Sequence, residues 1–375
     1  MLLPKKKSAY HDQLEKISNF IIRLLEFSIK YKMYNESKFL TYFREEGTWY
    51  LTKSKSIKGP VLSGFLGLFE LNIEDRKRLL KVYLNDIQFQ KLYKSEDYEL
   101  ESYSLEENLR TTLNNFLVPF YQNIFNNSGF QKIEGLSHSP FSRKEFLKGY
   151  KLTNEKSIQV CPICCGKIIW TDNMNHSELD HYFPKSIYPA LAIAADNLVP
   201  MCNDCNTKAK LGKNPLNNNG KGAIRNAFIP YVHSGIDEIT INYLLGEKSK
   251  FEVEILPNDP ADEFVKLRIK NFDRIYNIRE RWASDIELLY ESFMNVLTAR
   301  DVDGNNINNI QALQKEIEIQ RNAAKQGEEH IPSAYQNKCF FESTLNNQNM
   351  QKAILADYNK RTCSSLNSVQ PTMQP

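Results

Sequence analysis

Four cysteines fall into two closely spaced pairs, a pattern typical of a zinc site. Two residues separate Cys161 from Cys164, and two separate Cys202 from Cys205. This spacing lets each pair form a knuckle whose thiolates face one ion, and two such pairs complete the tetrahedral coordination of structural zinc. The sequence therefore predicts one structural Zn²⁺ that all four cysteines bind.

The remaining cysteines and a nearby histidine are weaker candidates for metal ligands. Cys165 directly follows Cys164, which does not fit the geometry of a knuckle, and Cys339 and Cys363 have no neighbouring ligand. His176 lies between the two pairs and is the alternative ligand if one cysteine does not bind. A zinc module that binds a partner without catalysis is the alternative to an enzyme.

The segment between the cysteine pairs contains residues suited to hydrolysis of a phosphodiester. Such a reaction needs a base for the attacking water and positive charge close to the phosphate. A histidine such as His181 suits the base near neutral pH. Asp180 offers a hard oxygen ligand for a divalent cation, and Asn197 and Asn206 are neutral groups that can orient the site. Because adjacent side chains of a strand face opposite ways, we expect Asp180 and His181 to lie where a strand ends or bends.

Together these motifs resemble the HNH endonucleases, or ββα-metal nucleases, in the form that carries a four-cysteine zinc site. The resemblance covers about residues 161–213. It implies that His181 is the general base and that Asp180 and Asn206 supply oxygen ligands to a catalytic Mg²⁺ or Mn²⁺. It also implies that Asn197 holds the metal loop in place. Many members of the family have histidine at the position of Asn206, and the asparagine favours a hard cation over a softer one.

Basic residues follow the predicted catalytic segment. Lys208, Lys210 and Lys213 belong to a stretch, residues 206–226, that contains no acidic residue, and Lys185 follows the Asp-His pair closely. Cationic side chains beside a hydrolytic site suit a polyphosphate partner. We therefore expect these lysines to contact nucleic acid, with a solvated basic loop as the alternative.

Bulk composition places the chain among ordinary globular proteins. Of its 375 residues, 41% are hydrophobic and 25% are charged, and the net charge of +3 is too small to identify a nucleic-acid binder. No apolar run approaches the ~20 residues of a membrane span. The first seven residues are basic but lack the apolar core of a secretory signal. We expect a cytoplasmic protein without membrane contact, in which cysteines stay reduced.

The hydrophobic pattern predicts an α+β protein that is predominantly helical, with a small central ββα-metal core flanked by helical regions. Apolar residues recur at helical spacing over residues 10–32. Helix starts are indicated at Asn72, and by capping boxes at Ser104 and Ser142.

The predicted core and the region after it contain both strands and helices. Short β-compatible segments at 168–170 and 179–183 precede a brief helix at 204–211, which is the strand–strand–helix order of the ββα-metal fold. Alternation of apolar and polar residues predicts a hairpin at 238–255. Helical spacing then predicts helices at 261–278, 280–299 and 308–325.

These features divide the chain into four parts with different expected roles. We expect residues 1–150 to form a helical region that docks a partner or nucleic acid, and residues 151–235 to form the nuclease core with its zinc site. Residues 236–330 should form a hairpin with helices that pack on the core, and residues 331–375 a polar, partly disordered segment.

The leading hypothesis is a metal-dependent HNH endonuclease that cuts DNA. One such site cleaves one strand, so nicking is the elementary step. The motifs are similar to those of HNH proteins from bacterial phage-defence operons, some of which act with an ATPase encoded alongside; the resemblance implies anti-phage defence with an ATPase partner. The alternatives are a ribonuclease that uses the same site, a non-catalytic zinc module that binds nucleic acid or protein, and a toxin-type nuclease.

Overall fold

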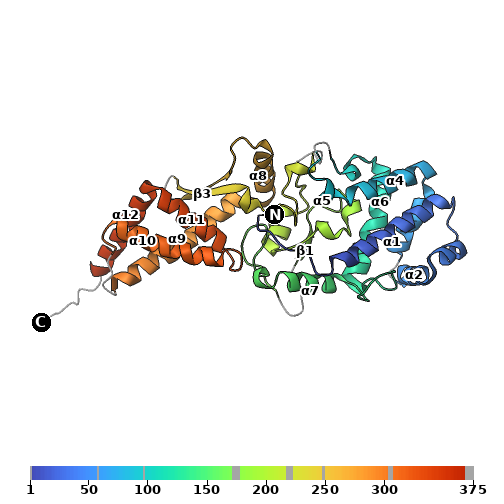
Figure 1. The fold of residues 1–375 in the computed structure, drawn as a ribbon, viewed down its shortest axis with the longest axis horizontal. Helices are drawn as coiled ribbons and strands as arrows, with labels where there is room; N and C mark the ends of the chain where they lie inside the picture. Colours follow the sequence, from blue (N-terminus) through green and yellow to red (C-terminus); the bar gives the residue numbers. More distant parts are fainter. Residues whose placement is uncertain are drawn as a thin grey trace.

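The chain forms an elongated molecule built mainly from helices, with two small antiparallel sheets in its described part (Figure 1). This confirms the predicted α+β, predominantly helical class. Within the same part, no helix combines the length and apolar character that crossing a bilayer requires. The computed structural model describes residues 2–56, 59–95, 98–170, 178–216, 223–246, 250–302 and 307–367.

The N-terminal part is a set of helices around one hydrophobic core. Most of these helices are amphipathic, and their apolar stripes face one another. The helices are α1 (His11–Lys30), α2 (Glu36–Ser56), α3 (Pro60–Gly67), α4 (Ile73–Asp86), α6 (Glu107–Pro119), the π-helical η3 (Phe120–Ser128) and α7 (Arg143–Thr153). The short α5 (Phe89–Leu92) packs instead in the other core, through Phe89.

The caps at the starts of these helices agree with the sequence pattern in two of three places. The side chains of Asn72 and Ser142 accept hydrogen bonds from main-chain amides in the first turns of α4 and α7, at 2.9 and 3.3 Å. The prediction at Ser104 was wrong, because that residue ends a 3-10 turn, η2 (Glu101–Ser104). The buried carboxylate of Asp86 stabilises this turn by accepting hydrogen bonds from the main-chain amides of Glu101 and Ser102, at 2.7 and 3.0 Å.

Helices α3 and α6 approach each other so closely at Gly64 that only glycine fits. A Cβ atom built on Gly64 would lie 2.0 Å from the carbonyl oxygen of Asn115. We expect Gly64→Ala to lower the free energy of unfolding by about 2–3 kcal/mol, because the two backbones must move apart.

The matched control for this prediction is Gly67→Ala at the end of the same helix, where an added Cβ meets nothing within 4 Å. Its backbone is right-handed helical, so the change should be neutral or should stabilise the protein by up to about 1 kcal/mol. Urea denaturation of both variants measures the difference. Equal stability of Gly64→Ala and the wild type would contradict the close packing.

The C-terminal part surrounds a second core, which also contains the cysteine-rich region. The hairpin and the helices predicted from residue 238 to residue 325 are confirmed. Its elements are β3 (Ile239–Leu245), β4 (Phe251–Pro257), α8 (Glu263–Tyr276), α9 (Ile278–Val302), α10 (Ile310–Gly327), α11 (Ala334–Asn346) and α12 (Gln348–Asn367).

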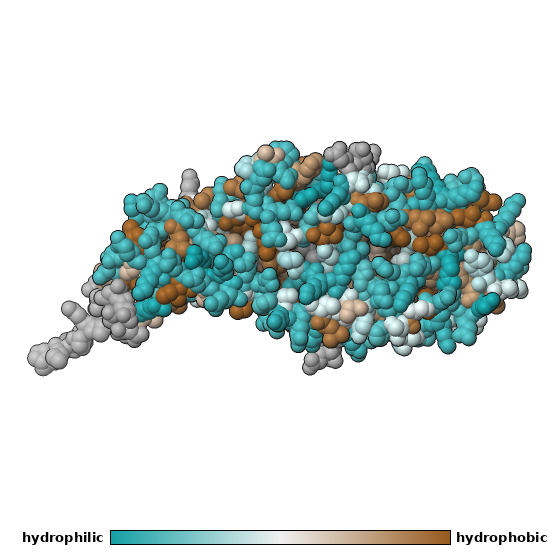
Figure 2. Space-filling view, in the orientation of Figure 1, coloured by the Kyte–Doolittle hydropathy of each residue, from teal (hydrophilic) through white to brown (hydrophobic). Residues whose placement is uncertain are grey.

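Much of the final segment is helical. α11 and α12 cover residues 334–346 and 348–367, and α12 reaches into the stretch from Cys363 on where disorder was predicted. These helices bury Phe340, Phe341 and Tyr358 in the C-terminal core. A few apolar residues on one face are therefore enough to pack each helix against the core, although most of its residues are polar. Residues 368–375, where disorder was also predicted, lie outside the described residues. Figure 2 shows apolar side chains only in small groups on a mostly hydrophilic face.

A two-stranded sheet lies between the two cores. It pairs β1 (Glu178–His181) with β2 (Leu198–Met201). Leu179 and Leu198 belong to the N-terminal core, whereas Val199 and Met201 belong to the C-terminal core. Side chains alternate between the faces of a strand, so each face of this sheet serves a different core.

The prediction of a strand at 168–170 was wrong, and other residues form the second strand of the strand–strand–helix unit. Lys167 makes only a single β-bridge to Val160, and the second strand is β2, which the sequence pattern did not indicate. The proline at position 200 argues against a strand in the sequence, because proline has no main-chain N–H to donate to a neighbouring strand. A short π-helical segment, η7 (Asp204–Lys210), follows, so the chain still runs strand, strand, helix.

Candidate functional site

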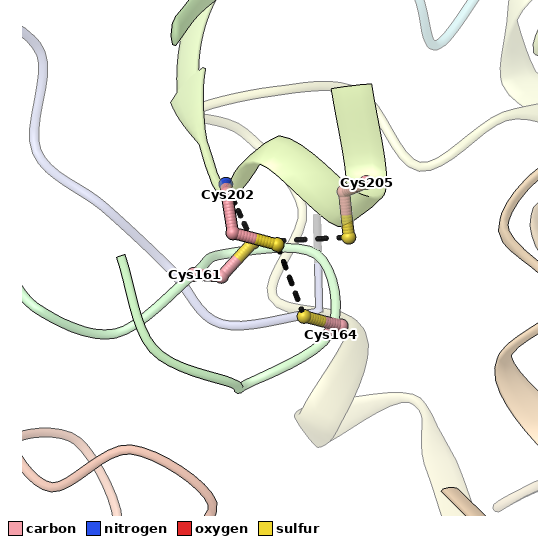
Figure 3. A group of neighbouring side chains, drawn as sticks. All are labelled: Cys161, Cys164, Cys202 and Cys205. Atoms are coloured by element: carbon pink, nitrogen blue, oxygen red, sulfur yellow. Dashed lines mark hydrogen bonds between the residues drawn. The ribbon is translucent and has the colours of Figure 1, made fainter. Parts of the chain in front are cut away.

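The predicted zinc ligands come together in space (Figure 3). The sulfurs of Cys161, Cys164, Cys202 and Cys205, here called the cysteine cluster, all lie within 4.8 Å of one another, and the side chains are buried. The Cys161–Cys205 and Cys164–Cys202 sulfur pairs are 4.0 and 3.6 Å apart. Around zinc, with Zn–S bonds of about 2.3 Å, tetrahedral geometry separates the sulfurs by about 3.8 Å. The cluster could therefore hold a metal such as zinc.

Local backbone geometry shapes each knuckle of the cysteine cluster. In the first, the amide of Cys161 donates to the carbonyl oxygen of Gly166 at 2.8 Å, and Cys165 turns the chain with a positive φ of 60°. In the second, the amide of Cys202 donates to the sulfur of Cys161 at 3.5 Å. Cys165 lies outside the group of four, as predicted from its position.

The thiols of the cysteine cluster differ in their pKa shifts: the pKa is lowered for Cys161 and Cys202 and raised well above the ordinary value for Cys164 and Cys205. Burial raises the pKa of a thiol, but hydrogen bonds from the other three cysteines hold the pKa of Cys161 well below its ordinary value. Arg281, from α9, donates to the sulfur of Cys205 at 3.4 Å. Burial opposes charge on this guanidinium, yet the attraction of the cluster, Cys205 first, raises the pKa of Arg281 above its ordinary value.

Asp180 and His181 end β1 and both line a pocket of about 370 Å³, here called the site pocket. The opposite wall comes from α6 and η3, through Asn114, Val118 and Gln122. His181 is only 4% exposed, and the side chain of Asp180 is 13% exposed. The two adjacent residues reach one pocket because the strand ends there.

The His181 ring is held in one orientation. Its Nε2 lies 2.8 Å from the carbonyl oxygen of Ala192, and the ring of Tyr121 packs edge-on at 4.2 Å. A carbonyl oxygen can only accept, so Nε2 donates, and in the neutral ring Nδ1 carries the free lone pair. Burial, followed by the repulsion of Lys185, holds the pKa of His181 well below its usual value. The ring is therefore a neutral imidazole, able to accept a proton at Nδ1.

Asp180 forms an ion pair with Lys210. The two side chains approach to 2.7 Å, and the same ammonium group donates to the carbonyl oxygen of His181 at 2.6 Å. Burial raises the pKa of Asp180, and the charge of Lys210 opposes that shift. Lys210 is 2% exposed, so it differs from the solvent-facing phosphate contact that the basic stretch indicated.

Asn197 is fully buried and fastens the loop after β1. Its amide oxygen accepts from the main-chain amide of Phe183 at 2.7 Å, and its amide nitrogen donates to the carbonyl oxygens of Phe183 and Leu191 at 2.9 and 3.1 Å. The loop so fastened leads directly to Ala192, whose carbonyl group orients His181. Asn197 thus fixes the backbone around the histidine.

The other predicted residues occupy different positions. Asn206 lies in η7, half-buried, and is not among the residues that line the site pocket. Lys185 lines the pocket, with its ammonium 5.5 Å from the centre of the Tyr121 ring, and burial lowers its pKa. Lys208 and Lys213 are exposed, and Lys208 pairs with an aspartate in the same helix at 2.6 Å. His176 lies outside the described residues.

Three contacts of the site come from residues that the sequence pattern did not indicate. Ala192 acts through its main chain, which no side-chain motif reports. Tyr121 and Arg281 lie far along the chain from the residues they touch, His181 and Cys205. Only the fold brings them together.

Comparison with known proteins gives no relative from which a function could be inferred. No model of a protein family, no curated protein and no solved structure matches the chain. What the site can do is therefore inferred from its own residues.

Proposed function

We propose that this chain is a metal-dependent endonuclease of the HNH type that hydrolyses phosphodiester bonds of DNA. One observation supports this more than any other: the imidazole of His181 is fixed through Nε2 in a pocket that also contains a carboxylate and two lysines. A merely structural histidine has no need of an open pocket beside it. We further propose that the metal of the cysteine cluster is zinc and that it holds the strand–helix unit together.

A divalent cation suits the carboxylate of Asp180. The Asp180 side chain is 13% exposed and lines the site pocket, and its buried Oδ2 lies 2.7 Å from the ammonium group of Lys210. Mg²⁺ commonly binds proteins through one or two carboxylates and completes its shell with water and substrate phosphate, so Asp180 is a sufficient anchor. A cation bound to Oδ2 would compete with Lys210 for that oxygen.

The residues of the pocket account for each need of hydrolysis. A water molecule beside the phosphate loses its proton to Nδ1 of His181 while its oxygen attacks phosphorus. The P–O bond to the leaving sugar oxygen breaks, and solvent protonates that oxygen. Lys185 and Lys210 place positive charge near the phosphate. A divalent cation at Asp180 would add further neutralisation of the phosphate charge.

The direct test is cutting by the purified chain with Mg²⁺, Mn²⁺ or EDTA. Plasmid, single-stranded DNA and RNA serve as substrates. We expect DNA nicking that EDTA abolishes; cutting of RNA alone would favour a ribonuclease, and no cutting would favour a non-catalytic zinc module.

Asp180→Asn should raise the Mg²⁺ concentration required for half-maximal cutting at least about tenfold, because a neutral amide is a weaker ligand than a carboxylate. A metal titration of plasmid nicking measures this shift. The exposed Asp237, far along the chain, gives the matched control Asp237→Asn, which should titrate like the wild type. An unchanged requirement in Asp180→Asn would remove Asp180 from the metal site.

The setting that we propose from the resemblance is bacterial anti-phage defence with an ATPase partner encoded alongside. Co-purification of the tagged chain with the product of the adjacent gene tests this directly. An adjacent gene for an unrelated protein that does not co-purify would contradict it.

A further inference from the structure

The site pocket does not end at β1 but continues along α6. A second pocket of about 490 Å³ lies between α3 and α6, here called the α3–α6 groove, and it shares Asn114, Val118 and Gln122 with the site pocket. Asn114 and Val118 are four residues apart in α6 and so share one face of that helix, and Gln122 follows in the π-helical η3. The two pockets adjoin along these three residues.

The lining chemistry differs between the two pockets. The site pocket contains two cations, Lys185 and Lys210, beside the catalytic residues proposed above. The α3–α6 groove is lined mainly by neutral polar and small residues, among them Asn115, and Glu70 is its one charged residue in the described part of the chain. Lysine and arginine neutralise the phosphates of a nucleic-acid backbone, and amide side chains can hydrogen-bond both phosphates and base edges. The groove is therefore suited to bases.

The depth of the site limits the form of the substrate. The phosphate must reach His181, which is 4% exposed, and Asp180, whose side chain is 13% exposed. A duplex is stiff, with a persistence length of about 150 base pairs, so bending it into a recess walled by α6 costs about 1–6 kcal/mol. An unpaired strand bends freely and can turn its bases toward a protein wall.

We propose that the substrate is an unpaired nucleic-acid strand, with its scissile phosphate in the site pocket and the neighbouring bases in the α3–α6 groove. This inference rests on the proposed nuclease function and assigns a role to the N-terminal helices, as the wall that selects single-stranded substrate. The shared chemistry is that of an unpaired strand, and DNA and RNA are compared directly in the test.

Gly67 offers a way to block the groove without disturbing the fold. A Cβ at this position meets nothing within 4 Å, the backbone is right-handed helical, and the residue lines the groove. Gly67→Leu therefore places a side chain in the groove. Asn115→Ala removes an exposed amide from its wall, and Asn108→Ala, an exposed asparagine of α6 outside both linings, is the matched control.

The experiment measures kcat and KM of the full-length chain with Mg²⁺ or Mn²⁺. The substrates are a labelled DNA strand, its RNA equivalent, the corresponding duplex, a duplex with a central unpaired segment, and bis(p-nitrophenyl) phosphate as a small diester. We expect kcat/KM for unpaired strands to exceed that for the full duplex at least about tenfold.

Gly67→Leu should lower kcat/KM on unpaired strands, relative to the small diester, about tenfold and mainly through KM, with a smaller loss in Asn115→Ala. Asn108→Ala should match the wild type. Equal cutting of duplex and unpaired strands, or an unchanged KM in Gly67→Leu, would overturn this inference alone. Failure to cut any substrate, the small diester included, would overturn the proposed function and this inference with it.

Discussion

His181→Ala is expected to lower the rate of phosphodiester cutting by about 10²–10⁴-fold, which is the usual contribution of a positioned general base. The loss should appear in kcat, since the substitution removes the proton acceptor and leaves the lysines of the site pocket in place. Single-turnover nicking of plasmid measures the effect. A variant that nicks at the wild-type rate would refute the proposed mechanism.

The controls for His181→Ala separate chemistry from folding. His181 is buried and contacts Tyr121, so truncation also opens a small cavity. His181→Gln retains an amide that can donate to the carbonyl of Ala192 but has no basic nitrogen, and it should be equally inactive with a normal melting temperature and metal content. His330→Ala, at an exposed position, is the matched histidine control and should cut normally.

Cys202→Ser is expected to abolish zinc binding and to cost the protein most of its stability. Structural zinc contributes on the order of 10 kcal/mol in small zinc-binding peptides, while whole domains are stable by only about 5–15 kcal/mol. The cysteine cluster also joins segments forty residues apart that belong to one core. Metal analysis, soluble yield and thermal melting measure the loss.

Cys363→Ser provides the matched control for the cysteine cluster, because Cys363 is exposed and lies outside it. It should retain one equivalent of zinc and the wild-type melting temperature. Chelation of the wild type should reproduce the instability of Cys202→Ser. A full equivalent of zinc in Cys202→Ser would contradict binding by all four thiols.

Sequence reasoning predicted those parts of the site whose chemistry lies in side chains. The spacing of the cysteines is enough to predict their convergence, because a two-residue gap in each pair constrains the local backbone. The position of Asp180 and His181 at the end of a strand also follows from simple geometry, since two adjacent side chains share a pocket only where a strand stops.

What escaped prediction depends on packing between distant segments. The proline at position 200 hides β2, and its pairing with β1 is visible only in the fold. From the sequence, Lys210 resembles its exposed neighbours, but in the fold it is buried in an ion pair with Asp180. Sequence spacing does not reveal such a pairing between distant segments. The role of α6 as a wall of the site pocket is another such case, because nothing in its sequence refers to a site some sixty residues later.

The sheet formed by β1 and β2 has a consequence for the whole molecule. Each of its faces packs against a different hydrophobic core. Loss of packing in either core would expose one face of the sheet to water and would release the imidazole of His181 from its fixed orientation. The proposed activity therefore depends on the packing of both cores and not on the site pocket alone.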